Sequence, residues 1–463
     1  MKSTRGSLLI LILITVASRL FFLDAGCGAE EDAWGIRLAA KHFANTGEYE
    51  ASRLPGHPLQ EFVYAAIVNK TSILGMNSVT AFFSILACIF FFLILKELKC
   101  NHPFLGALAF AFTPIIYIHS TDCMDYIWAL AFILMSYYSL LKERIVLAGI
   151  MLGMAIGCRI TSGVMIIPFL LHLYYFKKDY LKNIGKLLIF TFMIAELIFI
   201  PVIQKYGWGF FHYYDQFPYP SFGKLIYKAS IGVWGITGCL GLLVFLLDRL
   251  RNYKIMGAIF FAYREQMYVW ITVPILYIGL YFMLPQKSAY LIPIVPFVII
   301  LADQYLTTIK YLIVVVMIVI SSFLFGINLS DKTRGSEPSS WSTTRTIGGQ
   351  EVSFDFLHGL VIDDYLKRKA RMEFTKKVLE KTALLTDQSI IISGWWLNPI
   401  LDELNEKKHD NVKYVYCIDT SEMQMYINKG FAIFYLPEMD SINDLRFRIS
   451  ATKNLAKPLF QTL

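Results

Sequence analysis

Three consecutive carboxylates follow the first apolar run of the chain. The run ends near Leu23, and Glu30, Glu31 and Asp32 come a few residues later in the stretch GCGAEEDAW. Ionisable groups in or near hydrocarbon are costly, so they usually mark a site. A carboxylate can accept a proton from a hydroxyl group or ligate a metal ion. Capping of a helix that begins here would account for one of these acids, but not for all three.

Basic side chains farther along the chain can complete such a site. Arg53 and His57 lie in the run SRLPGHP, and Arg159 and Lys287 each lie at the end of an apolar segment. A guanidinium group can bind phosphate through two parallel hydrogen bonds, whereas lysine acts as a point charge. Three alternatives stay open: an outer ion pair for Arg159, snorkelling to the interface for Lys287, and a turn without catalytic role for His57.

Two more carboxylates and a tyrosine belong to the same set of candidates. Asp122 and Asp125 lie in HSTDCMDYIWAL, at the head of another apolar segment. They could cap a helix, or they could face the first acids and share a divalent cation such as Mg²⁺ or Mn²⁺, or orient an acceptor. Tyr290, three residues after Lys287, would line the same pocket or belong to an interfacial aromatic belt.

The composition is that of a polytopic membrane protein. Of the 463 residues, 56% are hydrophobic and only 17% are charged, which is far from the soluble average. The net charge of +8 lies in short loops between apolar segments, as membrane orientation requires, and this excludes nucleic acid as a partner. The seven cysteines show no CxxC pair, so neither a disulfide framework nor a zinc site is indicated.

A window of bilayer length predicts about eleven transmembrane helices. They lie near residues 7–24, 77–96, 103–120, 124–141, 145–158, 161–176, 186–203, 229–248, 267–285, 288–306 and 310–327. With the N-terminus in the cytoplasm, the loops rich in Lys and Arg fall on the cytoplasmic side. Every candidate site residue then lies at the outer face. A signal peptide is the alternative for the first segment, but the later spans need Met1 inside.

Two short patterns predict how individual helices pack. Apolar residues recur at helical spacing after the acidic run: Ala33, Ile36, Ala40 and Phe43. This predicts a helix that lies along the membrane surface, begins at Asp32 and stops at Gly47. In the segment 145–158, three glycines recur at every fourth residue, Gly149, Gly153 and Gly157. That spacing predicts tight packing on a neighbouring helix.

The C-terminal part has a different composition. Residues 330–350 are rich in Ser, Thr, Gly and charge, and helical periodicity over 354–385 is followed by the β-rich runs SIIIS, VKYVYCI and FAIFYL. We predict a transmembrane domain over 1–327, a linker over 328–353 and a small extracytoplasmic α/β domain over 354–463 with three parallel strands. The run SGWWLNP follows the first strand, where α/β folds often bind ligands; packing of the two tryptophans is the alternative.

The order and common sidedness of these motifs resemble a known superfamily. EEDAW with SRLPGHP, HSTDCMDYIWAL, GCRITSG and LPQKSAYLIPIVP are similar to the C-type membrane glycosyltransferases (GT-C), on the branch with protein O-mannosyltransferases and aminoarabinose transferases. The resemblance covers residues 1–327 and does not include the C-terminal α/β domain. It implies an α-helical polytopic membrane fold and an inverting transfer of a sugar from a polyprenyl-phosphate donor to a glycan, lipid or protein acceptor at the outer face.

The resemblance also implies roles for the candidate residues. The catalytic acid of the first loop is matched by Asp32, with Glu31 as the alternative, and the second acidic position by Asp122 or Asp125. His57 is matched to a metal or phosphate ligand. The donor phosphate would be bound by the basic residues and their aromatic neighbour, Arg53, Arg159, Lys287 and Tyr290. A divalent cation stays an open possibility, and the expected location is the inner membrane, multi-pass, among membrane lipid.

Two other classes of protein compete with this interpretation. A lipid-linked sugar flippase would place polar groups along a path through the membrane and show internal repeats. A polyprenyl-linked polysaccharide polymerase or ligase would carry its key arginines and histidines in large, late outer loops. The sequence shows an early acidic loop instead, which favours the transferase.

Overall fold

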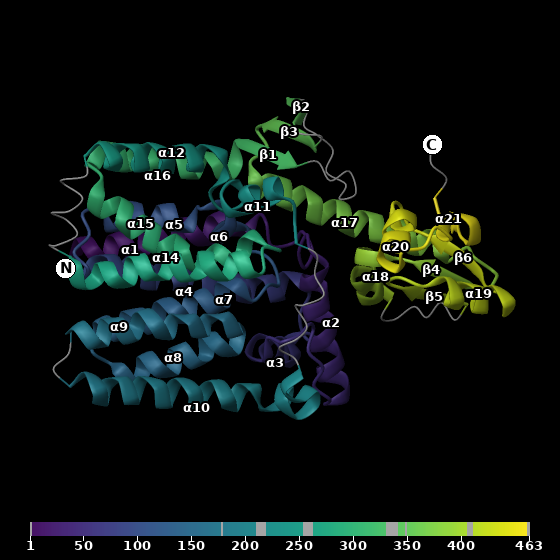
Figure 1. Ribbon diagram of the computed structural model, residues 1–463, viewed down its shortest axis with the longest axis horizontal. Coiled ribbons are helices and arrows are strands. Elements are labelled where there is room, and N and C mark those ends of the chain that lie inside the picture. Colours follow the sequence, from purple (N-terminus) through teal and green to yellow (C-terminus); the bar gives the residue numbers. More distant parts are fainter. Residues whose placement is uncertain are drawn as a thin grey trace.

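A bundle of long helices carries a smaller α/β unit at one end (Figure 1). The structure, a computed structural model, describes residues 2–176, 179–209, 219–252, 263–329, 341–347, 350–404 and 411–460. The helices of the bundle and its loops are α1 (Lys2–Leu20), α2 (Glu31–Thr46), α3 (Pro58–Ile67), α4 (Ile73–Glu97), α5 (Pro103–Ala111), α6 (Pro114–Ile118), α7 (Tyr126–Leu141), α8 (Ile145–Cys158), η1 (Ile160–Met165), α9 (Ile166–Phe176), α10 (Tyr180–Tyr206), α11 (Phe222–Ala229), α12 (Ile231–Arg251), α14 (Arg264–Met283), η3 (Ser288–Ile294), α15 (Val295–Tyr305) and α16 (Thr308–Phe323).

The bundle is that of a helical membrane protein. Within the described ranges, five helices are long and apolar enough to cross a membrane: Ile73–Glu97, Tyr180–Gly209, Ile231–Arg251, Arg264–Met283 and Ser288–Tyr305. Four further apolar helices are shorter, and the two remaining predicted segments correspond to α1 and to the pair α5 and α6. Each of the eleven predicted segments therefore contains a helix, while the number that crosses the membrane stays a prediction.

The segment predicted as one span over 103–120 is interrupted. α5 ends at Ala111, and Pro114 begins α6. Proline has no N–H to continue the helical ladder and suits a first helical position, so the chain restarts there. At the end of α5, the carbonyl of Ala111 accepts a hydrogen bond from the buried guanidinium of Arg19. The interruption leads the chain into the loop that carries Asp122 and Asp125.

The three glycines of α8 allow close contact with α10. A Cβ atom at Gly149 would come within 2.9 Å of the carbonyl oxygen of Leu187, and one at Gly153 within 2.8 Å of that of Thr191. The prediction that this helix packs tightly on a neighbour is confirmed. The contact holds in place the C-terminal end of α8, where Arg159 lies.

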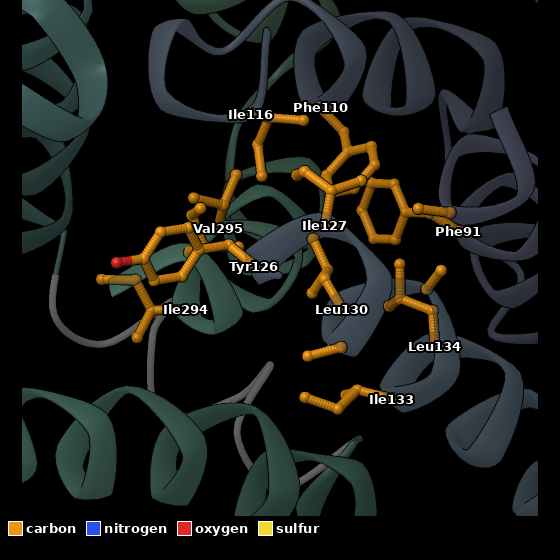
Figure 2. Close-up of a cluster of buried hydrophobic side chains, with 14 of the residues drawn as sticks. Phe91, Phe110, Ile116, Tyr126, Ile127, Leu130, Ile133, Leu134, Ile294 and Val295 are labelled. Carbon is orange, nitrogen blue, oxygen red and sulfur yellow. The ribbon is translucent and has the colours of Figure 1, made fainter. Parts of the chain in front are cut away.

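The core of the bundle fixes the start of α7. Phe91, Phe110, Ile127 and Leu134 meet from α4, α5 and α7, and all four are buried (Figure 2). Removing a buried phenylalanine side chain typically costs about 3–5 kcal/mol. This packing fixes the position of the residues just before and at the first turn of α7, which belong to the candidate site.

The predicted surface helix is α2. It runs from Glu31 to Thr46 and ends at Gly47, which has the left-handed conformation (φ 73°) and donates its N–H to the carbonyl of Phe43. Its apolar face is buried, as the spacing of Ala33, Ile36 and Ala40 predicts. Glu30 occupies the N-cap position without a capping hydrogen bond from its side chain. Capping therefore does not explain that carboxylate.

The region predicted as a linker forms strands where the structure describes it. β1 (Phe325–Leu329), β2 (Ser342–Ile347) and β3 (Gln350–Phe356) make an antiparallel sheet in the order β1-β3-β2. The last predicted span is therefore too long, because α16 ends at Phe323. The predicted helix over 354–385 also begins later, since α17 starts at Leu360. Pairing between distant segments decides these strands, which local composition does not reveal. Residues 330–340 and 348–349 of the predicted linker lie outside the described residues.

The C-terminal α/β unit contains a parallel sheet in the order β5-β4-β6-β7. Its elements are α17 (Leu360–Thr382), β4 (Ser389–Ile392), η5 (Gly394–Trp396), α18 (Leu397–Leu404), β5 (Val412–Val415), α19 (Thr420–Asn428), β6 (Ala432–Tyr435), α20 (Met439–Phe447), α21 (Thr452–Leu455) and β7 (Lys457–Pro458). The three predicted strands are present, and β7 is a fourth, too short to show a pattern. Trp396 is buried in the core of this unit, which supports packing as its role.

The α/β unit docks on the helix that carries Asp32. α18 packs on α2, and Arg37 and Lys41 of α2 both contact the carboxylate of Asp402, at 3.0 Å and 2.5 Å. Asp402 is almost completely buried. Arg368 of α17 donates to the carbonyls of Gly26 and Thr121. These bonds link the α/β unit to both loops that carry the candidate carboxylates.

Candidate active site

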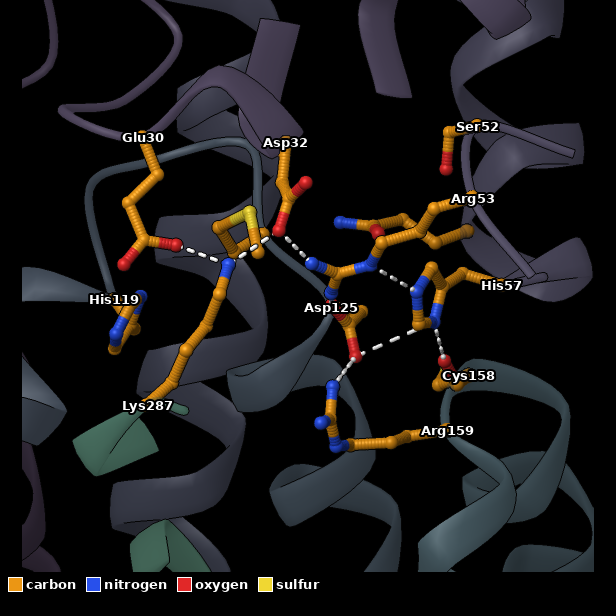
Figure 3. Close-up of polar contacts among 12 residues, drawn as sticks. Glu30, Asp32, Ser52, Arg53, His57, His119, Asp125, Cys158, Arg159 and Lys287 are labelled. Atoms are coloured by element: carbon orange, nitrogen blue, oxygen red, sulfur yellow. Dashed lines mark hydrogen bonds and ion pairs between the residues drawn. The ribbon is translucent and has the colours of Figure 1, made fainter. Parts of the chain in front are cut away.

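Acidic and basic side chains from five parts of the chain form one connected ion network (Figure 3). We use this name for the following residues: Glu30, Asp32, Arg53, His57, Asp125, Arg159 and Lys287. Asp32 connects the two halves of the network, because its carboxylate is paired both with Arg53 and with Lys287. Lys287 is also paired with Glu30.

The loop before α3 places Arg53 between two carboxylates. One terminal nitrogen of Arg53 bonds Asp32, and the other lies 3.2 Å from an oxygen of Asp125. The Nε–H of Arg53 donates to Nε2 of His57 at 3.1 Å. Glu61 anchors this loop, because its carboxylate accepts hydrogen bonds from the backbone N–H and the hydroxyl of Ser52.

His57 is fully engaged within the protein. Its Nδ1 lies 2.9 Å from the carbonyl oxygen of Cys158. Since Nε2 accepts from Arg53, Nδ1 carries the proton and donates to that carbonyl. Burial lowers the pKa of His57, and the pull of Asp125 does not reverse this. A neutral His57 therefore positions Arg53, and neither ring nitrogen is left for a phosphate or a metal ion.

Asp125 joins the network from the N-cap position of α7. Its side chain makes no capping hydrogen bond; one oxygen lies 2.7 Å from Arg159 and the other 3.2 Å from Arg53. The Asp125 carboxylate is completely buried, whereas 24% of the Asp32 side chain is exposed. Of these two acids, only Asp32 can meet a reactant without displacing protein.

The guanidinium group of Arg159 packs on two aromatic rings. Its guanidinium carbon is 4.4 Å from the ring centre of Tyr126 and 4.8 Å from that of Tyr290. Cation–π contacts of this kind are attractive and keep the planar group in one orientation. The structural ion pair considered for Arg159 thus exists, with Asp125, and a phosphate could still approach the rest of the guanidinium.

The charges of the network shift the pKa values of its members. Burial by itself would raise the pKa of Asp32, but the positive charges of Arg53 and Lys287 outweigh it and hold this pKa well below its usual range. For Lys287, burial by itself would lower the pKa, but the nearby groups Glu30, Tyr126 and Asp32 outweigh it and raise this pKa above its ordinary value. Asp32 is therefore ionised and Lys287 protonated at neutral pH.

Two of the predicted acids lie beside the network rather than in it. Asp122 accepts from the N–H of Met124 and pairs with Nδ1 of His119 at 2.8 Å. Glu31 contacts the α/β unit through its backbone carbonyl, which accepts a hydrogen bond from Asn398. Burial, with the nearby charge of Asp32, raises the pKa of the Glu31 carboxyl to about 7. The geometry thus favours Asp32 over Glu31 and Asp125 over Asp122 as partners in one site.

The arrangement does not fit the divalent cation that the sequence left open. Asp32 and Asp125 contact different nitrogens of Arg53, which stands between them. Among the residues that the structure describes, no three His, Cys, Asp or Glu side chains come together as metal ligands. We therefore derive no catalytic step through a metal ion.

Several residues of the site were not among the predicted ones. Glu30 belongs to the acidic run, but its position in the sequence indicates no role of its own; in the structure it pairs with Lys287. Glu61, His119 and Tyr126 lie within a few residues of predicted positions, at or inside apolar segments of the sequence. A buried charge inside an apolar helix, as in LQEFVYAAI, is the signal that could have found Glu61.

Comparison with solved structures shows that the fold of this chain is similar to known ones. Searches against models of known protein families and among curated proteins find no match. The structure is similar to the crystal structure of ArnT from Cupriavidus metallidurans in the apo state, with a TM-score of 0.53 and 12% sequence identity. The match covers 96% of this chain and 91% of ArnT. The two chains share a fold. The shared fold extends through the C-terminal unit, beyond the part to which the sequence resemblance was assigned.

Proposed function

We propose that this protein is an inverting glycosyltransferase that moves a sugar from a polyprenyl-phosphate donor to a hydroxyl group of a glycan, lipid or protein. The observation that carries the proposal is the placement of Asp32. Its side chain is partly exposed, and its carboxylate touches two cations that can bind a phosphate, Arg53 and Lys287. The fold shared with ArnT, an aminoarabinose transferase, supports a lipid-linked donor and the membrane as the place of action.

In the proposed reaction the acceptor hydroxyl attacks the anomeric carbon from the face opposite the phosphate. The bond between that carbon and the phosphate oxygen breaks, and polyprenyl phosphate leaves with the electron pair. Asp32 takes the hydroxyl proton as general base. Lys287, Arg53 and Arg159 stabilise the negative charge that develops on the phosphate.

Donor binding would also activate the base. In the structure, Arg53 and Lys287 keep the pKa of Asp32 low, and so weak a base would accept a proton poorly. A phosphate that draws these two cations toward itself removes part of their effect on Asp32. The pKa of Asp32 then rises toward the range that suits proton transfer, and it does so only when the donor is in place.

A direct assay tests the proposal. Purified protein is incubated in detergent with a panel of polyprenyl-phosphate sugars and candidate acceptors, and release of polyprenyl phosphate is followed. We expect release that depends on the acceptor and an inverted anomeric centre in the product. A flippase would leave every donor intact, and a polymerase or ligase would transfer a polymer rather than a single sugar, so either result would refute the proposal.

The proposal includes a location. The ion network and the α/β unit are assigned to the outer face of the inner membrane, with the N-terminus in the cytoplasm. Lys and Arg of the loops at the other ends of the helices favour this orientation.

A further inference from the structure

Tyr126 carries a buried hydroxyl group that nothing in the described part of the chain satisfies. It is the first residue of α7 and only 2% exposed, and its hydroxyl oxygen has no hydrogen-bond partner among the described residues. Buried polar side-chain atoms in proteins nearly always have a partner, so an exception needs an explanation. A ligand that brings the missing partner is one such explanation.

The ring of Tyr126 lies among residues of the candidate site. The guanidinium of Arg159 stacks on it at 4.4 Å, and the imidazole of His119 lies 4.7 Å away on centroids. The ring of Tyr290 follows at 6.3 Å. In Figure 2 the hydroxyl of Tyr126 points away from the buried side chains of Phe91 and Ile127. The ring is thus packed, and its polar end is directed out of the apolar core.

The surroundings of the hydroxyl determine which group it can bind. Burial by itself would lower the pKa of Arg53, but Asp32 and then Tyr126 raise it, so the phenol oxygen lies near this cation. Tyr126 also raises the pKa of Lys287, against the effect of burial. Lysine and arginine have only donors, so the tyrosine O–H cannot donate to either. A ligand that satisfies this O–H beside two cations must be an acceptor and is best an anion.

We propose that the Tyr126 hydroxyl donates a hydrogen bond to the phosphate of the lipid-linked donor. This rests on the proposed function, since it assigns a further binding residue to the same site. A phosphate has oxygen acceptors only and a negative charge, which matches an unpaired O–H beside Lys287 and Arg53. A sugar hydroxyl matches less well, because it is uncharged.

Binding of polyprenyl phosphate without a sugar tests this assignment independently of transfer. Tyr126→Phe keeps the ring under Arg159 and removes only the hydroxyl. Titration of polyprenyl phosphate, read by its stabilisation of the purified protein against heat, should show about tenfold weaker binding for this variant. Without ligand, the variant should unfold at the same temperature as wild type or higher, because it lacks an unsatisfied buried group.

Tyr311→Phe is the matched control. Tyr311 is also buried, its hydroxyl also lacks a partner among the described residues, and it stacks on His102 where α5 begins. This variant should bind polyprenyl phosphate like wild type. Equal affinities for wild type and Tyr126→Phe would overturn the assignment while leaving the proposed function intact. Weaker binding with a lower unfolding temperature of the free protein would mark a packing role and overturn it too. A wild type that does not bind polyprenyl phosphate would overturn both proposals.

Discussion

At the scale of single residues, the site depends on which carboxylates share cations. Asp32 and Asp125 are joined through Arg53, while Asp122 pairs with His119. The partner of each acid thus assigns its role more sharply than its position in the sequence does. Two predictions follow from these partners.

The first concerns Asp32 as the base. Asp32→Asn keeps the size of the side chain and its place between Arg53 and Lys287 but removes the basic oxygen. We expect transfer to fall at least a hundredfold, as for loss of other general bases, with the helical content and unfolding temperature little changed. Turnover is measured with the best donor from the panel. Activity within about threefold of wild type, less than 1 kcal/mol in the barrier, would exclude Asp32 and direct the search to Glu31.

The second concerns Glu31 and pH. Its carboxyl has a pKa of about 7 in the folded protein, above the ordinary value of 4.5, so the folded state holds this proton more tightly than the unfolded state does. The stabilisation is complete below about pH 4.5 and is lost as the pH rises through 7. Its size is roughly 3 kcal/mol at most, since one pKa unit corresponds to 1.36 kcal/mol.

Glu31→Gln removes this titration. Thermal unfolding followed from pH 5 to pH 8 should show wild type losing more stability than the variant over this interval. If the unfolding temperatures of the two proteins changed with pH in parallel, the Glu31 carboxyl would not titrate in the folded protein over this interval.

At the scale of elements, two helix contacts hold the site in shape. α2 carries Asp32 and is clamped to α18 by Arg37, Lys41 and Asp402. α8 carries Arg159 at its end and lies against α10 through three glycines. Each contact can be broken by one substitution outside the ion network.

Loss of the Asp402 carboxylate should loosen α2. Asp402→Ala leaves two buried cations without their partner, and breaking a buried pair costs about 3–5 kcal/mol. We expect faster hydrogen exchange in α2 and α18, with the long helices of the bundle unchanged. The control is Lys453→Ala, which removes an exposed partner of Asp440 and should cost little. Unchanged exchange in α2 would show that the clamp does not hold this helix.

A methyl group at Gly153 should separate α8 from α10. The new Cβ would lie 2.8 Å from the backbone oxygen of Thr191 and 2.7 Å from the Cβ of Ile194, and neither atom can move easily. We expect Gly153→Ala to lower stability by about 1–3 kcal/mol, as overpacking does. Gly163→Ala is the control, because nothing lies within 3.7 Å of its added Cβ. Thermal unfolding in detergent compares the two, and equal values would contradict tight packing.

At the scale of the whole molecule, the ion network and the α/β unit lie at the same end of the bundle. Bonds from Arg368, Asn398 and Asp402 tie the unit to the loops that carry Asp122 and Asp32. The side of the membrane on which this end lies therefore decides which donors and acceptors the site can reach.

Thiol labelling determines that side. In a cysteine-free variant, a single cysteine at Lys429, which is exposed on the α/β unit, should react with an impermeant thiol reagent added to intact spheroplasts. One at Lys182, exposed at the start of α10, should react only after permeabilisation. The reverse result would place the acids in the cytoplasm, where a nucleotide-linked donor would serve instead of a polyprenyl phosphate.

The sequence by itself determined the features that depend on neighbouring residues. The spacing of Ala33, Ile36 and Ala40 predicts α2, and Gly47 ends it because the left-handed conformation is cheap for glycine. Apolar runs of bilayer length predict the helices of the bundle, since burial and hydrogen bonding are local within each helix. The residue types that form the ion network are also visible there, as ionisable groups beside apolar runs.

Only the tertiary structure decided which of these residues meet. Arg53 lies 72 positions from Asp125 in the sequence, and Lys287 lies 255 positions from Asp32. Asp122 and Asp125 are equivalent as sequence signals, but a shift of three residues at the start of α7 directs them to different partners. The same holds for β1 and β3, which replace part of a predicted span and linker. Pairing at such separations depends on the packing of whole helices and strands, whose geometry no short stretch of sequence contains.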